Sequence, residues 1–101
     1  MVEPGVLARL KTDPKTVGAR QTLRALHKGI ARLVYVAQDA DPEVTGPILE
    51  LSQRQAVQVV YVDSMHALGR ACGIDVGASA AALIVDRDVS PDAKRQRKGG
   101  A

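Results

Sequence analysis

The residues best suited to chemistry gather in one short stretch of small, cationic and amide side chains: Gly18, Ala19, Arg20, Gln21, Arg24 and Lys28. Successive residues of a helix are about 100° apart. A helix over residues 20–28 therefore carries the polar side chains on one side and Leu23 and Leu26 on the other. Gly29 then provides a natural helix end. The pattern predicts an amphipathic helix with a narrow basic and amide face.

The chemistry of this face suits a nucleic acid. A Gly-Ala start lets the backbone approach a ligand closely, and a helix N-terminus offers free N–H groups and a positive dipole end to phosphate. Arg20 and Arg24 can each donate two hydrogen bonds to guanine O6 and N7 or to phosphate, and Gln21 offers a donor and an acceptor. Because regular A-form RNA hides its base edges, base reading would require irregularly paired RNA. A merely solvated cationic helix face is the alternative.

Residues that could catalyse a reaction or hold a metal do not form a recognisable motif. His27 and His66 fall in separate predicted helices, without a spaced acidic or thiol partner. Cys72 lies on the apolar side of its helix, as a small core residue does. Asp39 and Asp41 are close enough to suggest a metal site, but helix capping explains Asp41 more simply. We therefore expect no catalytic residue, no metal and no cofactor.

Charge is unevenly distributed along the 101 residues, although the net charge is only +3. Basic residues predominate in residues 1–32, acidic ones in residues 33–92, and only basic ones occur in residues 93–101. Such asymmetry favours a polyanionic partner on one face. Phe and Trp are absent and the chain has two Tyr, which disfavours base stacking on aromatic platforms.

The length and composition predict one domain over residues 1–88 and a basic, disordered tail over residues 89–101. The single cysteine excludes an internal disulfide. We find no apolar run of membrane-spanning length and no signal-peptide pattern. These features lead us to expect a cytoplasmic protein.

Three continuous, β-branched apolar stretches at residues 33–37, 57–62 and 80–85 predict strands that are covered on both faces. Segments with helical periodicity lie between them, which indicates an α/β sandwich. A further short helix is expected near residues 6–10. Residues 12–16 are expected to form a turn.

Two later helices carry clear start signals. Asp41 is predicted to cap a helix that begins at Pro42, and Ser64 to cap one that ends at Gly73. Pro47 lies beyond the first turn of the helix that begins at Pro42, where a proline disturbs the helical hydrogen bonds. A kink or a restart of the helix at Pro47 is therefore expected. In that helix the apolar residues expected to face inward are Val44, Ile48 and Leu51. In the second helix they are Met65, Leu68 and Cys72.

The segment from Ile74 to Ser79 has the composition of a loop but contains two branched apolar residues. Little in the sequence would bury Ile74 and Val76. Either a ligand covers them or both side chains turn into the sheet.

Four blocks of this chain, in this order and spacing, resemble the kink-turn RNA-binding ribosomal protein family L7Ae, and its small bacterial members in particular. The blocks are residues 18–24, 33–42, 68–77 and 78–85, and the similarity spans about residues 5–86. The resemblance implies a three-layer α/β/α sandwich with a four-stranded mixed sheet. It also implies binding to a kink-turn, which is an RNA helix bent sharply at a bulge beside tandem sheared G·A pairs.

In the family, the helix start that matches Arg20, Gln21 and Arg24 reads the G·A pairs, and the loop that matches residues 74–78 packs against an extruded base. The chain departs from the archaeal pattern, which usually has Asn-Glu where Arg20 and Gln21 stand. A Lys/Arg-Gln pair resembles bacterial members and the L30e branch. Arg24 replaces a common Lys and so keeps the charge with a different geometry.

We therefore expect a non-catalytic, monomeric protein that binds kink-turn RNA, as a ribosomal or ribosome-associated component. The expected RNA contacts are Gly18, Ala19, Arg20, Gln21, Arg24, Lys28, Ile74, Asp75, Val76, Gly77 and Ala78. Two other readings stay open. The same fold can serve as a protein-interaction adaptor, in which the acidic residues 39–50 would dock a basic partner. It can also be the substrate-recognition domain of an RNA-modifying enzyme.

Overall fold

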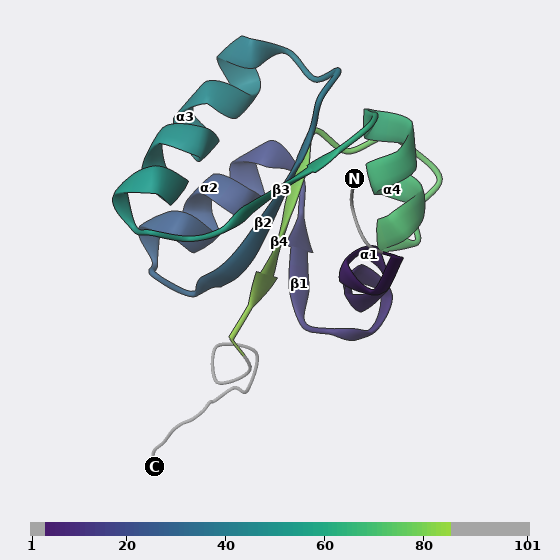
Figure 1. Ribbon diagram of the computed structural model, residues 1–101, viewed down its shortest axis with the longest axis horizontal. Coiled ribbons are helices and arrows are strands. Elements are labelled where there is room, and N and C mark those ends of the chain that lie inside the picture. Colours follow the sequence, from purple (N-terminus) through teal and green to yellow (C-terminus); the bar gives the residue numbers. More distant parts are fainter. Residues whose placement is uncertain (1–3, 86–101) are drawn as a thin grey trace.

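Helices and strands alternate along the chain in the computed structural model, which describes residues 4–85 (Figure 1). The elements are α1 (Pro4–Thr12), β1 (Lys15–Val17), α2 (Ala19–His27), β2 (Ala31–Ala37), α3 (Pro42–Arg54), β3 (Val59–Val62), α4 (Met65–Cys72) and β4 (Ala80–Ile84). No helix in this part of the chain is long and apolar enough to cross a membrane. The tail expected at residues 89–101 lies outside the described residues.

The strands form one mixed sheet in the order β1-β4-β2-β3. The β2–β3 pair is parallel, with Val36 opposite Tyr61, and the other two pairs are antiparallel. The central strands β2 and β4 consist mainly of buried apolar residues, as expected for strands covered on both faces. The four-stranded mixed sheet implied by the resemblance is thus confirmed.

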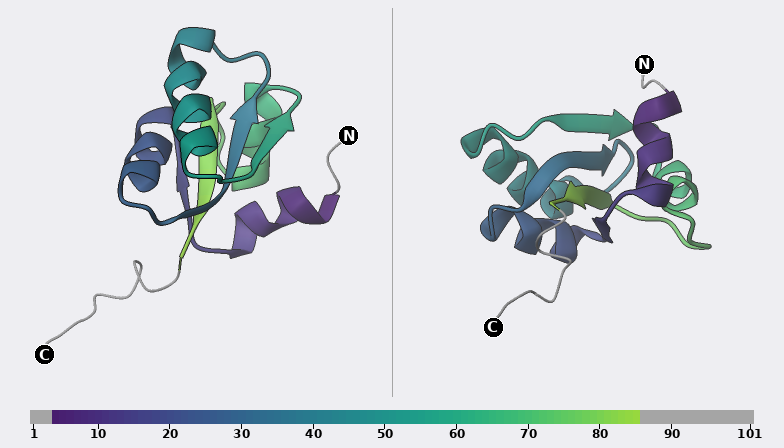
Figure 2. Two further views of the ribbon diagram at one scale, coloured as in Figure 1. Left: turned by 60° about the vertical axis from the view of Figure 1, so that its left-hand side comes forward. Right: turned by 90° about the horizontal axis from the view of Figure 1, so that it is seen from below.

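Alternate residues of the central strands divide the core into two halves. On one face, Leu33 and Tyr35 of β2 belong to a cluster that also includes residues of α1 and α4. On the other face, Val34 and Val36 belong to a cluster with residues of α2 and α3. Figures 1 and 2 show these helix pairs on opposite sides of the sheet. The predicted three-layer α/β/α sandwich is confirmed.

The predicted helix ends are confirmed. The Asp41 side chain accepts a hydrogen bond from the backbone N–H of Glu43 at 2.9 Å, and Pro42 is the first residue of α3. The Ser64 hydroxyl accepts one from the N–H of Ala67 at 3.0 Å, and Gly73 ends α4 with a φ of 83°. These contacts satisfy N–H groups that have no partner within the helix.

Two local predictions were wrong, and one alternative of a third is excluded. Lys15 and Thr16, expected in a turn over residues 12–16, belong to the edge strand β1, because they pair with β4. The helix α3 continues through Pro47, which excludes the restart but not the kink that was the other expectation. Val44 is exposed, since the inward-facing side chains of α3 are those of Thr45, Ile48 and Ser52. The spacing of Thr45, Ile48 and Ser52 places them on one face of the helix, and Val44, one residue before Thr45, lies outside this face.

Candidate nucleic-acid interface

The start of α2 leaves backbone donors available. Gly18 precedes the helix with a φ of 109° and a ψ of 152°, and no side chain among the described residues caps this end. The first bond of the helical ladder runs from the N–H of Thr22 to the carbonyl of Gly18, at 2.9 Å. The N–H groups of Ala19, Arg20 and Gln21 therefore lack the intrahelical acceptors that later residues have. Together with the helix dipole, they suit an anion.

The backbone conformation before α2 favours glycine. The φ of Gly18 is positive and lies in the region that side chains disfavour. A Cβ at this position would also come within 2.7 Å of Oε1 of Gln21, but that atom is the end of a flexible, exposed side chain, which can move aside. The backbone therefore accounts for the glycine, and the Gln21 amide lies near the helix start.

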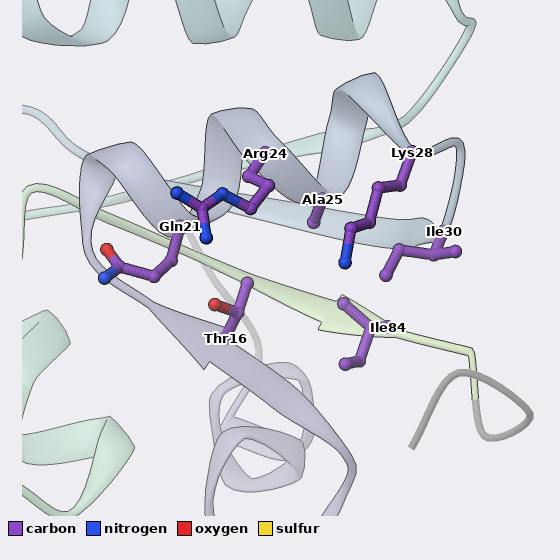
Figure 3. A pocket seen from close by; sticks show the side chains of 7 residues that line it. All are labelled: Thr16, Gln21, Arg24, Ala25, Lys28, Ile30 and Ile84. Atoms are coloured by element: carbon purple, nitrogen blue, oxygen red, sulfur yellow. The ribbon is translucent and has the colours of Figure 1, made fainter. Parts of the chain in front are cut away.

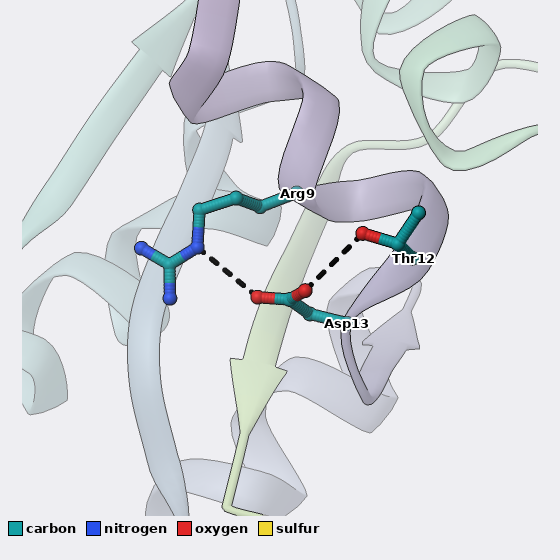
Figure 4. Close-up of polar contacts among 3 residues, drawn as sticks. All are labelled: Arg9, Thr12 and Asp13. Atoms are coloured by element: carbon teal, nitrogen blue, oxygen red, sulfur yellow. Dashed lines mark hydrogen bonds and ion pairs between the residues drawn. The ribbon is translucent and has the colours of Figure 1, made fainter.

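The polar face predicted for α2 points to solvent. Arg20, Gln21, Arg24 and Lys28 are exposed, whereas Thr22 and Leu26 are fully buried on the opposite side. We call these four exposed residues the basic stripe. Its cations are not neutralised within the described residues, where the two ion pairs are Arg9–Asp13, which Figure 4 shows, and Glu50–Arg54.

Three residues of the basic stripe line a groove of about 190 Å³ between α2 and the neighbouring strands. Figure 3 shows the side chains of Gln21, Arg24 and Lys28 above Thr16 of β1 and Ile84 of β4. Arg20 is not among the lining residues, so it presents its charge outside the groove. Helix α2 can therefore meet a polyanion both at its N-terminus and along its length.

The loop from Ile74 to Ser79 is held against α4. Ile74 donates its N–H to the carbonyl of Gly69 at 3.1 Å, and Ala78 donates its N–H to the carbonyl of Met65 at 3.0 Å. A Cβ at Gly69 would overlap the carbonyl oxygen of Val76, and one at Gly77 would come within 3.2 Å of Cβ of Met65. Glycine at these two positions lets the loop lie directly on the helix.

This packing leaves the apolar residues of the loop outside the core. The side chain of Val76 is 69% exposed and that of Ile74 is 36% exposed, so neither turns into the sheet. Asp75 and Gly77 are exposed as well. Ala78 differs from the other predicted contacts, because its side chain is only 5% exposed and belongs to the core. Its side chain is therefore not available to a ligand.

Hydrogen bonds bring the two segments to the same end of the sheet. Gly18 donates its N–H to the carbonyl of Ala80 at 2.8 Å, and Ala37 donates its N–H to the carbonyl of Ser79 at 3.0 Å. Asp39 at the end of β2 accepts the N–H of Met65, the first residue of α4, at 2.7 Å. The start of α2 and the last residues of the loop thus share one edge of the fold.

Two contributors to this surface were not identified in the sequence. Thr16 lines the groove because β1 lies beneath α2, and a predicted turn over residues 12–16 gave no reason to expect this. Asp39 connects the end of β2 to the start of α4. The neighbouring acidic residues Asp39 and Asp41 were the available signal in the sequence, but they pointed only to Asp41 as a helix cap and not to the contact between Asp39 and α4.

The side chains considered for catalysis and metal binding are either buried in the core or exposed on separate helices. Cys72 is buried, and this burial raises the pKa of its thiol, which disfavours the reactive thiolate. His27 and His66 are exposed on different helices. Within residues 4–85, no three His, Cys, Asp or Glu side chains come together as metal ligands would.

Comparison with known proteins gives consistent matches. The sequence model of the ribosomal protein L7Ae/L30e/S12e/Gadd45 family matches residues 2–94. An RNA-binding protein of Geobacillus sp. (strain WCH70) is 47% identical over 75 residues, which are 74% of this chain and 92% of the relative. The large ribosomal subunit protein eL8 of Halobacterium salinarum is 34% identical over 76 residues, which are 74% of this chain and 63% of that protein.

A solved structure agrees with these sequence matches. The 15.5kD RNA binding protein of Giardia lamblia superposes with a TM-score of 0.75 and 28% identity, covering 85% of this chain and 76% of its own. The fold and the sequence matches thus point to the same group of proteins. The chain belongs to the ribosomal protein L7Ae/L30e/S12e/Gadd45 family.

Proposed function

We propose that this protein is a non-catalytic RNA-binding protein that recognises kink-turn RNA as a cytoplasmic monomer. The observation that carries the proposal is the uncapped start of α2, where Arg20, Gln21 and Arg24 are exposed and neither arginine has an ion-pair partner among the described residues. The names of the Geobacillus relative and of the Giardia neighbour support RNA as the ligand. The match to the large ribosomal subunit protein eL8 supports association with the ribosome.

In this mechanism, the helix start reads guanines that sheared G·A pairs leave accessible. Arg20 and Arg24 donate to guanine O6 and N7 or to phosphate, and Gln21 pairs with a base edge. Backbone N–H groups after Gly18 hold a phosphate, and Lys28 continues the contact along the groove. Because these contacts require the bent RNA, binding shifts the RNA toward the bent form.

The loop provides an apolar contact next to this polar one. Val76 and Ile74 cover an extruded base, with Asp75 and Gly77 completing the loop surface. Their exposure supports this role, since an RNA ligand would remove both apolar side chains from water. Ala78 contributes to the loop only through its backbone.

The basic segment Lys94, Arg95, Arg97 and Lys98 adds attraction to phosphate that does not depend on RNA sequence. Deleting residues 94–101 should weaken binding to all RNAs similarly and reduce the salt dependence of the affinity. A loss confined to kink-turn RNA would contradict this role.

The decisive measurement compares two RNAs with the full-length protein in a titration. One RNA contains the kink-turn and the other has its G·A pairs replaced by Watson–Crick pairs. We expect Arg24→Ala to weaken kink-turn binding by about 1–3 kcal/mol and to reduce the preference for the kink-turn. Arg54→Ala is the matched control, because Arg54 is also an exposed arginine on a helix, but on α3. Equal affinity of the protein for the two RNAs would disprove kink-turn recognition.

A further inference from the structure

Met65, the first residue of α4, joins the loop to the turn after β2. Its N–H donates a hydrogen bond to Oδ1 of Asp39 at 2.7 Å, and its carbonyl accepts one from the N–H of Ala78 at 3.0 Å. Both partners lie at the edge of the sheet where α2 begins. A single residue thus connects two segments that border the proposed RNA site.

The side chain of Met65 extends this connection to the last residues of the loop. The Ser79 hydroxyl donates a hydrogen bond to Sδ of Met65 at 3.7 Å, and thioether sulfur is a weak acceptor. A Cβ at Gly77 would come within 3.2 Å of Cβ of Met65, so the loop backbone lies directly on this side chain. Met65 is half-buried and also packs against the core cluster on the α1 and α4 face. Gly77, Ala78 and Ser79 therefore all take their positions from contacts with Met65.

The chain contains three sulfur atoms, in Met1, Met65 and Cys72, and they differ in availability. Met1 lies outside the described residues. Cys72 is buried, and the burial raises the pKa of its thiol, which disfavours the thiolate that a peroxide oxidises. A thioether needs no deprotonation, and Met65 is partly accessible to solvent. Within residues 4–85, Met65 is therefore the sulfur best placed to react with a peroxide.

We propose that Met65 is an oxidation site that controls binding at the RNA surface described above, an inference that rests on the proposed function. The sulfur attacks one oxygen of hydrogen peroxide, the O–O bond breaks, and the product is methionine sulfoxide. The sulfur loses two electrons, and the second peroxide oxygen takes up both protons and leaves as water. Because methionine sulfoxide reductases reverse this step, the modification acts as a switch.

The sulfoxide disturbs the two kinds of contact that Met65 makes. Its oxygen is polar and attracts water, so it disfavours the apolar packing against the core cluster. It also adds an atom to a side chain that already touches the loop backbone at Gly77, and such overpacking displaces the neighbours. Because Ile74 and Val76 precede the displaced residues, their apolar side chains leave the position in which the RNA would bury them.

The test treats the full-length protein with hydrogen peroxide until peptide mass spectrometry shows Met65 as the sulfoxide. We expect affinity for kink-turn RNA to fall about tenfold. In NMR spectra without RNA, the backbone amide resonances of Val76 and Ala78 should shift. The resonance of Val34, in the core cluster on the opposite face of the sheet, should not. Incubation with methionine sulfoxide reductases A and B should restore both the affinity and the spectrum.

Three variants assign the effect to one sulfur. Met65→Leu keeps an apolar side chain of similar volume without sulfur, so peroxide should not change its RNA affinity. Met65→Gln places a polar group at this position and should bind kink-turn RNA more weakly than the original protein without any peroxide. Cys72→Ala is the control, because it removes the other sulfur of the described residues. It should remain as sensitive to peroxide as the original protein.

Two results would overturn the inference. One is unchanged RNA affinity, or unshifted loop resonances, when Met65 is fully oxidised. The other is an equal loss of affinity in peroxide-treated Met65→Leu, since the reactive group would then lie elsewhere.

A second RNA, with Watson–Crick pairs in place of the G·A pairs, separates this inference from the proposed function. If the untreated protein binds both RNAs equally, kink-turn recognition fails, and the NMR spectra without RNA still decide whether oxidation moves the loop. If the untreated protein prefers the kink-turn and oxidation leaves that affinity unchanged, only the role of Met65 is disproved.

Discussion

The carbonyl oxygen of Val76 lies against Gly69, in the space that the Cβ of any larger residue at position 69 would occupy. Such a Cβ would also lie 3.0 Å from the carbonyl carbon of Val76 and 3.1 Å from Cα of Gly77. These neighbours are backbone atoms, so they cannot move aside by a side-chain rotation. The position of the loop, and hence the exposure of Val76, depends on the glycine in α4.

The first prediction concerns this contact. Gly69→Ala should destabilise the protein by about 1–3 kcal/mol, because overpacking displaces the loop or the helix. Gly46→Ala is the matched control, since Gly46 is also inside a helix but has nothing within 4 Å of the added Cβ. It should stabilise the protein by about 0.5–1 kcal/mol. Urea unfolding measures both effects, and destabilisation of equal size in the two variants would contradict the packing argument.

The second prediction separates the loop's proposed RNA contact from its effect on stability. Val76→Ser removes an apolar side chain that is mostly exposed, so the free energy of unfolding should change little. Affinity for kink-turn RNA should nevertheless fall by about 1 kcal/mol, because the RNA would no longer bury that side chain. Val44→Ser makes the same change on α3 and should leave RNA affinity unchanged. Equal affinities of the two variants would exclude Val76 from the interface.

The parts of the fold that were predictable from sequence are those with local signals. Strands β2 and β4 are continuous apolar runs, and Asp41 and Ser64 cap helices whose starts they also mark. Strand β1 has only three half-buried residues, and its pairing with β4 depends on residues more than sixty positions away. No periodicity can appear in so short a segment.

The candidate site likewise has parts that could be predicted from the sequence and parts that could not. Helical periodicity alone predicted that the basic stripe of α2 would face solvent. The groove beside it could not be predicted, since it requires Thr16 and Ile84 from strands that are distant in sequence. The composition of the loop left open whether Val76 lies outside the core or turns into the sheet. The structure shows that it is exposed, and the contact of its backbone with Gly69 is the cause.

The third prediction concerns Pro47, where α3 continues although either a kink or a restart was expected. Pro47 has no N–H to donate to the carbonyl of Glu43, so the helix lacks one hydrogen bond there. Burial of Thr45, Ile48 and Ser52 on one face holds α3 together across this gap. Pro47→Ala should therefore stabilise the protein by about 1–2 kcal/mol in urea unfolding.

Pro42 supplies the control for this prediction. It is the first residue of α3, where the missing N–H has no partner in the helix in any case. Pro42→Ala should therefore give no comparable gain. A similar stabilisation by both substitutions would show that the position within the helix is not the cause.

The last prediction is a pH dependence at the end of α1. Nε of Arg9 donates a hydrogen bond to Oδ2 of Asp13 at 3.1 Å, and the Thr12 hydroxyl donates one to Oδ1 at 3.2 Å (Figure 4). The bond from Arg9 is the main cause that lowers the pKa of Asp13 below its ordinary value. A lowered pKa in the folded state means that ionised Asp13 stabilises the fold above the unfolded-state pKa, near 3.8. This contribution disappears as the pH falls through the folded-state pKa.

Replacing Arg9 tests this assignment. In Arg9→Ala, NMR titration of the Asp13 side chain should give a pKa closer to the ordinary value, whereas Arg54→Ala should leave that pKa unchanged. The stability difference between the original protein and Arg9→Ala should be larger at pH 7 than at pH 2, because protonated Asp13 no longer attracts the guanidinium. Since both side chains are partly exposed, added salt should reduce the difference at pH 7. A pKa of Asp13 that is the same with and without Arg9 would show that other groups set it.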